Sequence, residues 1–163
     1  NVLWCSGMAR PFIACLAVLG RQPQHNPLFV RVFGKRDQLT FHYYVHYAID
    51  IIEEKLESIR GNSTVPLDKY LGVLCPIDEY KVYGYITISD IKFVVVVEDV
   101  FNWEADIKSL FRWLHGLYVD VLLNPFTVLD QPIVSRRFAA EIDKVIGSHE
   151  SIFKTRTSNV SSP

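Results

Sequence analysis

The sequence predicts an α+β domain in which a five-stranded, mainly antiparallel sheet carries helices on both faces. The first observation is the stretch 78–97, which contains two adjacent strand patterns joined at Ser89-Asp90. The second of these strands, Ile91 to Val97, is almost continuously apolar, which is typical of a strand covered on both faces. The second observation is the element order ββαβββαα, with strands joined by short links. We therefore expect one helix on one face and two on the other.

The first 33 residues contain a short leader and a predicted hairpin. Met8 is the only methionine, so we interpret residues 1–7 as an expression remnant or a translated leader, and residues 8–147 as the domain. Phe12 to Leu19 is an apolar run that indicates a buried strand. Leu28 to Phe33 alternates between apolar and polar residues and is its expected partner, across a turn-rich link.

A long amphipathic helix is predicted over Thr40 to Arg60, because apolar residues recur there at steps of three and four. Gly61-Asn62 provides the stop signal. The inward stripe is expected to contain His42, Val45, Ile49, Ile52, Leu56 and Ile59. The acidic residues Glu53, Glu54 and Glu57 are expected on the other face.

The remaining elements follow the same logic. Tyr70 to Leu74 is expected to be a short strand ended by Pro76, and Tyr80 to Ile88 is the first of the two adjacent strands. A second helix is expected over Glu104 to Leu123, where apolar residues again recur at steps of three and four.

The C-terminal part is expected to contain one more helix and a tail. Ser135 is the expected N-cap for a helix that runs to about Ile146, with Phe138, Ile142 and Val145 facing inward. Residues 148–163 are rich in serine and threonine, and we expect them to form a disordered tail.

Composition excludes several functional classes. The net charge of −1, from 17 basic and 18 acidic residues, provides no electrostatic footprint for nucleic acid. The three cysteines are an odd number without Cys-x-x-Cys spacing, which argues against a zinc site or a disulfide framework and favours a reducing cytosol. No apolar run approaches the roughly 20 residues that span a bilayer.

Two groups of residues could in principle support metal binding or nucleophilic catalysis. His42, His46 and Asp50 recur at four-residue steps and could ligate a metal, but they spread over about 12 Å along one helix. A pair of histidines at the edge of a core helix is the simpler interpretation. Cys15 and Cys75 have no activating base nearby in the sequence. We therefore expect no catalytic, cofactor-binding or metal-binding residues.

The stronger functional signal lies on the first helix. Tyr43, Tyr47, Asp50 and Glu54 follow one another at three to four residues, away from the core stripe. Aromatic residues beside an acid on a solvent-facing side favour a partner surface, where the rings bury area and the charge sets orientation. The alternative is a solvated acidic face with two incidental tyrosines.

One short motif follows the second helix. Asn124-Pro-Phe126 resembles a ligand of endocytic adaptors, but such ligands sit in flexible tails. We therefore expect Pro125 to end the helix and Phe126 to fill a gap in the core.

Taken together, the segments resemble the sedlin family of longin-fold proteins, and within it the subunit 2-like branch of the trafficking protein particle (TRAPP) complexes. The order of the matching segments, rather than any single one, makes the resemblance specific, and Tyr80 to Tyr85 favours that branch over sedlin itself. The matching segments are 39–46, 49–55, 70–74, 78–85, 92–97, 107–112 and 124–126, with Ser135 and Phe138.

The resemblance implies a longin fold and a non-enzymatic adaptor role in TRAPP, a vesicle tether that exchanges nucleotide on Rab GTPases in endoplasmic-reticulum-to-Golgi and Golgi traffic. It implies core and larger peripheral TRAPP subunits as partners, a Rab GTPase indirectly, and a cytoplasmic location, peripheral to Golgi and intermediate membranes through the complex. The family's acidic position on the first helix maps onto Asp50. The alternatives are sedlin itself or the longin regulatory domain of a SNARE-type membrane-fusion protein.

Overall fold

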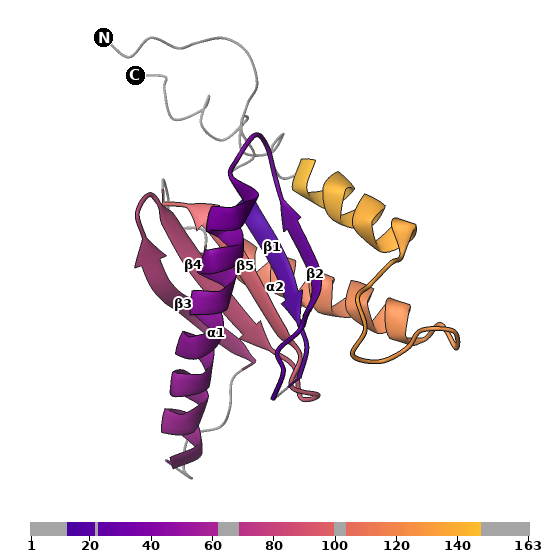
Figure 1. Ribbon diagram of the computed structural model, residues 1–163, viewed down its shortest axis with the longest axis horizontal. Helices are drawn as coiled ribbons and strands as arrows, with labels where there is room; N and C mark the ends of the chain where they lie inside the picture. The colour runs from indigo at the N-terminus through magenta and orange to yellow at the C-terminus, as the bar shows by residue number, and fades with distance from the viewer. Residues whose placement is uncertain (1–12, 22, 62–68, 100–103, 148–163) are drawn as a thin grey trace.

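The expected α+β class and element order are confirmed by the computed structural model (Figure 1). It describes residues 13–21, 23–61, 69–99 and 104–147. The predicted leader and tail therefore lie outside the described residues. The elements are β1 (Ile13–Leu19), β2 (Pro27–Val32), α1 (Gln38–Gly61), β3 (Tyr70–Ile77), β4 (Tyr80–Ile86), β5 (Lys92–Glu98), α2 (Glu104–Leu122) and a third helix over residues 136–147.

The five strands form one antiparallel sheet in the order β2-β1-β5-β4-β3. The two hairpins expected from the sequence, β1–β2 and β4–β5, are both present. β5 lies in the centre, between β1 and β4. Its central position explains why its sequence is apolar on both faces rather than alternating.

The two faces of β5 enter two separate hydrophobic clusters. Phe93, Val95 and Val97 pack with residues of α2 and the third helix. Val94 and Val96 pack with residues of α1 on the opposite side. Figure 1 shows α1 in front of the sheet and α2 behind it. The expected arrangement of one helix on one face and two on the other is therefore confirmed.

The core stripe of α1 differs from the expected one at its N-terminal end. Phe41 and Tyr44 are buried there, whereas His42 is exposed. Phe41 makes edge-to-face contacts with Tyr44 at 5.5 Å and with Tyr80 of β4 at 5.3 Å between ring centroids. The prediction that His42 faces inward is wrong. The aromatic cluster between α1 and β4 buries Phe41 and Tyr44 instead, which leaves the histidine facing solvent. Ile59 is only half-buried.

The third helix begins where the sequence indicates. The Ser135 hydroxyl accepts a hydrogen bond from the amide of Phe138 at 3.2 Å, as an N-cap does. Phe138 and Ile142 are buried against β5 and α2, and Val145 is half-buried against the same cluster. The predicted cap and inward residues are confirmed.

Two predictions about prolines need correction. Pro76 does not end its strand but lies within β3, opposite Lys81 of β4. β3 is an edge strand, and an edge tolerates a residue that lacks a backbone N–H. Pro125 does follow the end of α2, but Phe126 beyond it is 90% exposed and does not fill the core.

One ammonium group lies inside the fold. Lys92 of β5 is fully buried, and its Nζ lies 3.2 Å from Glu53 Oε1 and 3.2 Å from Asp90 Oδ1. His25 Nδ1 is 3.4 Å from the same nitrogen. The prediction that Glu53 belongs to the solvent face of α1 is therefore wrong, because its carboxylate turns toward this buried charge.

Candidate partner interface

The solvent side of α1 carries an unusual set of exposed side chains for a helix packed on a sheet. Tyr43 is 67% exposed and Tyr47 is 45% exposed. Asp50 and Glu54 are exposed on the next turns. Leu39, one turn before Tyr43, is 78% exposed. We refer to Leu39, Tyr43, Tyr47, Asp50 and Glu54 as the α1 outer face.

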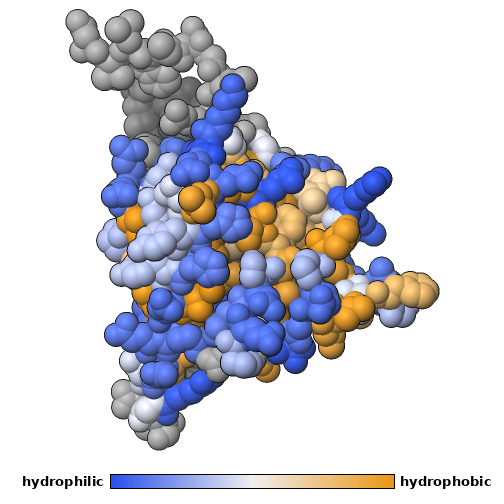
Figure 2. Space-filling model, in the orientation of Figure 1, coloured by the Kyte–Doolittle hydropathy of each residue, from blue (hydrophilic) through white to orange (hydrophobic). Residues whose placement is uncertain are grey.

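These five residues lie on one line of the helix. At about 100° per residue they fall within an arc of about 80°, and they extend over about 22 Å along the axis. The buried residues of α1 are centred on the opposite side, against the sheet. Figure 2 views the molecule from the side on which α1 lies in front of the sheet. The structure therefore brings the four predicted residues together on one surface.

The α1 outer face is apolar at one end and acidic at the other. Leu39, Tyr43 and Tyr47 occupy the N-terminal half, and Asp50 and Glu54 follow. Tyr rings provide contact area at low entropy cost while their hydroxyls stay hydrated. The sequence analysis missed Leu39, although its four-residue spacing from Tyr43 was a usable signal. The arrangement can bury an apolar patch and orient a basic partner.

Side-chain contacts hold α1 firmly against the edge of the sheet. The Tyr44 hydroxyl donates a hydrogen bond to Asp78 Oδ2 at 2.9 Å, in the turn between β3 and β4. Burial raises the pKa of Tyr44, and the hydrogen bond to Asp78 raises it further, so the phenol stays protonated. Lys55 donates to the Val73 carbonyl of β3 at 2.9 Å. These two contacts fix the position of α1, and so of its outer face, relative to β3 and the β3–β4 turn.

The N-terminus of α1 is capped by a carboxylate. Asp37 Oδ1 accepts a hydrogen bond from the Leu39 amide at 3.1 Å, and Asp37 Oδ2 accepts one from the Thr40 hydroxyl at 2.7 Å. These bonds lower the pKa of Asp37, the Thr40 bond most strongly. The cap explains why α1 begins at Gln38, two residues before the predicted start.

Neither described cysteine has the properties of a catalytic nucleophile. Burial raises the pKa of Cys15 to about 12 and also raises the pKa of Cys75. His42, His46 and Asp50 are exposed, and no group of three possible metal ligands occurs within the described ranges. None of the helices in that part of the chain is long and apolar enough to cross a bilayer.

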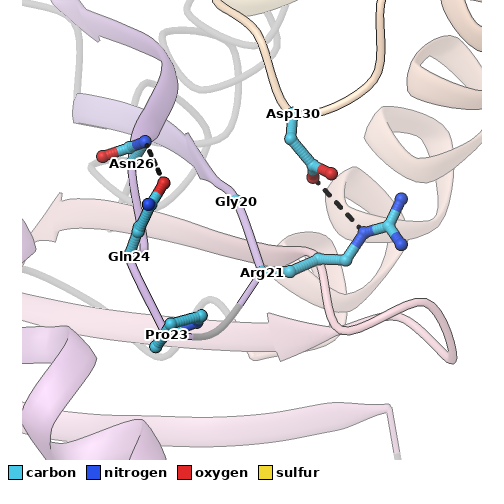
Figure 3. A pocket seen from close by; sticks show the side chains of 6 residues that line it. All are labelled: Gly20, Arg21, Pro23, Gln24, Asn26 and Asp130. Atoms are coloured by element: carbon cyan, nitrogen blue, oxygen red, sulfur yellow. Dashed lines mark hydrogen bonds and ion pairs between the residues drawn. The ribbon is translucent and has the colours of Figure 1, made fainter.

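A small hollow of about 300 Å³ lies beside the turn between β1 and β2 (Figure 3). Arg21 Nε lies 3.3 Å from Asp130 Oδ1, so this ion pair links the turn to the loop after α2. Among the described residues that line the hollow, the two charged ones are therefore paired with each other. The hollow is lined by Gly20, Arg21, Pro23, Gln24, Asn26 and Asp130.

Comparison with known families decides the classification. A family model described as Sedlin matches residues 20–148, which include every described element from β2 to the third helix. The chain belongs to the sedlin family.

Relatives of this sedlin-family chain carry closely related names. It is 40% identical to the trafficking protein particle complex subunit 2-like protein of Xenopus tropicalis over 126 residues, which are 76% of this chain and 89% of the relative. It is 38% identical to the protein of the same name from Dictyostelium discoideum over 141 residues, 83% of this chain and 97% of the relative. A transport protein particle 20 kDa subunit of Schizosaccharomyces pombe is 28% identical over 104 residues, 63% of this chain and 69% of the relative.

The family and the branch expected from the sequence are therefore confirmed. The relatives with about 40% identity carry the subunit 2-like name, as the Tyr80–Tyr85 strand indicated. The matched region also contains the whole α1 outer face. The five-stranded antiparallel sheet with helices on both faces is consistent with the longin-like fold of the family.

Proposed function

We propose that this sedlin-family chain is a non-enzymatic assembly subunit of a TRAPP complex. The relatives named as trafficking particle subunits support membership. The observation that carries the proposal is the α1 outer face, on which an exposed aromatic row continues into two acidic residues. A surface of this kind binds a partner protein rather than a small substrate.

The charge pattern of the α1 outer face defines the partner surface. Tyr43 and Tyr47 need an apolar hollow that takes two rings, and Leu39 extends the same apolar area. Asp50 and Glu54 need basic side chains on the partner, about two helical turns from the site of the rings. The partner is therefore a folded TRAPP subunit with an apolar groove that ends in a basic patch.

The complex gives the subunit its cellular role. We propose that the chain acts in vesicle tethering and in nucleotide exchange on a Rab GTPase, in traffic from the endoplasmic reticulum to the Golgi and within the Golgi. In this role the chain contacts core and larger peripheral TRAPP subunits, and contacts the Rab only indirectly. It reaches cytoplasmic membrane surfaces through the complex.

The test is co-purification of TRAPP subunits with tagged wild-type and variant chains. Asp50→Tyr should leave the chain folded and lose neighbouring subunits, because a bulky ring replaces the orienting charge. Tyr43→Ala should have the same effect through loss of buried area. Asp120→Tyr, at an exposed acid on α2, is the matched control and should retain the subunits.

Each failure has a distinct meaning. A wild-type chain that recovers no TRAPP subunit contradicts membership in the complex. Recovery by the wild type and by both outer-face variants contradicts the interface while leaving membership intact. Unfolding of Asp50→Tyr, measured by circular dichroism, would make Asp50 a structural residue and remove it from the interface.

A further inference from the structure

The turn that follows α2 displays an aromatic ring to solvent. Phe126 is 90% exposed, in the sequence Asn124-Pro125-Phe126-Thr127. A phenyl ring that is left in water forgoes the stabilisation that burial in the core would provide. The turn follows α2, which covers the sheet face opposite α1, and the proposed assembly surface does not include it. Its exposure therefore needs a separate explanation.

Hydrogen bonds fix the conformation of this turn. The Asn124 carbonyl accepts from the Thr127 amide at 3.0 Å, which closes a four-residue β-turn. The Asn124 side-chain Oδ1 accepts from the Phe126 amide at 3.1 Å. The Thr127 hydroxyl donates to the Val121 carbonyl at 2.8 Å and ties the turn to the end of α2. Pro125 restricts the backbone further. Phe126 is therefore held outward by a preformed turn.

The loop beyond the turn is also anchored. The Ile133 amide donates to the Leu28 carbonyl of β2 at 2.7 Å. The ion pair between Asp130 and Arg21 holds the middle of the loop, as Figure 3 shows. The turn is therefore held by α2 on one side and by the Asp130 and Ile133 contacts on the other. This restraint lowers the entropy cost of binding through the turn.

The surroundings of Phe126 are apolar and nearly uncharged. Large apolar side chains at Leu123, Val128, Leu129 and Val134 are also mostly exposed. A groove of about 440 Å³ runs beside the ring, between the end of α2 and the segment before the third helix. Figure 2 shows this loop as an apolar projection at the right-hand edge of the molecule. An exposed apolar patch of this kind marks a binding site.

The chemistry of the turn selects one kind of occupant. None of the residues that line the groove beside Phe126 is charged, so the surface that binds there should be uncharged. A second copy of this chain would need roughly 800 Å² on each partner, more than one short turn provides. A lipid layer would bury the ring but would not require the hydrogen-bonded Asn-Pro geometry. A protein pocket that takes one ring and one amide satisfies all of these features.

We propose that the Asn124–Thr127 turn is a preformed ligand for an adaptor domain with an apolar pocket for a single phenyl ring. Phe126 enters the pocket, and the exposed Asn124 amide donates to a carbonyl at the pocket rim. The groove beside Phe126 accepts an apolar side chain from the same rim. The chain thus carries a second binding surface, and an adaptor bound there can attach the proposed TRAPP assembly to another trafficking component.

The test measures binding of the purified full chain to a purified endocytic-adaptor domain that binds Asn-Pro-Phe peptides, by isothermal titration. We expect saturable binding, and we expect a free Asn-Pro-Phe peptide to compete with it. Phe126→Ala should weaken it at least about tenfold, as loss of a buried ring implies. Asn124→Ala should also weaken it, because the turn loses its side-chain bond. Ile88→Ala, at an 89% exposed residue of the β4–β5 turn, should leave binding unchanged.

Other outcomes would overturn the proposal. The first is no detectable binding at a millimolar concentration of the adaptor domain. The second is binding that the Phe126→Ala change does not weaken. Self-association that Phe126→Ala abolishes in sedimentation would assign the turn to a second copy, and Phe126-dependent binding to phosphatidylcholine vesicles would assign it to lipid. Loss of TRAPP subunits from Phe126→Ala would assign it to the assembly. Unchanged thermal unfolding of each variant checks that it is folded.

Discussion

Lys92 Nζ and Glu53 Oε1 lie 3.2 Å apart and join the centre of the sheet to the helix that covers it. Lys92 is fully buried in β5, while the Glu53 side chain keeps 20% of its surface exposed. The pair therefore connects a buried cation to an anion that still reaches water. A buried ion pair adds little net stability, but removing one partner leaves an uncompensated charge.

Glu53→Met is expected to lower the free energy of unfolding by about 3 kcal/mol, because the fully buried Lys92 ammonium loses one of its two carboxylate partners. Lys81→Met, which breaks the more exposed pair with Asp99, should cost much less, because water and salt screen this pair. Urea unfolding measures both. The double variant Lys92→Met with Glu53→Met should recover much of the loss, and a purely additive double variant would contradict the coupling.

Gly84→Ala is expected to destabilise the sheet by about 1–3 kcal/mol. A Cβ at Gly84 of β4 would lie 2.9–3.1 Å from the Leu74 side chain of β3. Combining it with Leu74→Ala should cost less than the sum of the two single changes, because the smaller side chain makes room. Thermal unfolding of the four proteins completes the cycle. If the losses of the two single variants simply add in the double variant, the contact between the Cβ added at Gly84 and Leu74 is not the cause of the destabilisation.

Tyr44→Phe is expected to cost about 1 kcal/mol, because it removes the hydrogen bond to Asp78 while keeping the ring in the core. Tyr43→Phe, on the adjacent residue of the same helix, should leave stability unchanged, because Tyr43 faces solvent. Urea unfolding compares the two. Equal losses in the two variants would contradict the assigned orientations.

Asp37→Asn is expected to change how stability depends on pH. The lowered pKa of Asp37 means that its charged cap stabilises the fold above the ordinary value of 3.8 and is lost as the pH falls through the lower folded-state value. Asparagine caps a helix without titrating. The stability advantage of the wild type over the variant should therefore be largest near neutral pH and shrink in acid. Urea unfolding from pH 7 to about pH 3 measures it, and a constant difference would contradict the role of the charge.

The sequence predicts those features that depend on neighbouring residues. The Ser135 cap, the two-sided burial of β5 and the exposed positions of Tyr43 and Tyr47 all follow from local spacing. Local spacing gives the wrong burial for His42. Phe41 and Tyr44 are buried in its place because they contact Tyr80 of β4, which is distant in the sequence. Helical periodicity alone cannot separate these neighbouring positions.

Features that join distant segments were also missed. Glu53 and Lys92 lie on different elements, so nothing in either local pattern reveals their pairing. Phe126 looked like a core residue because aromatic residues are usually buried after a core helix. Its exposure follows from the hydrogen bonds of the turn, which use Asn124 and Thr127 to direct the ring outward.

The central position of β5 also determines when the sheet can be completed during synthesis. The β1–β2 hairpin and the β3–β4 hairpin do not pair with each other, and both wait for β5. On the ribosome, a nascent chain that ends before Lys92 therefore carries two hairpins with open, apolar edges. Ile13 gains its partner Val97 only after nearly the whole sheet sequence has emerged. Pairing over such long separations is slow, and open apolar edges of this kind favour aggregation until the fifth strand is available to cover them.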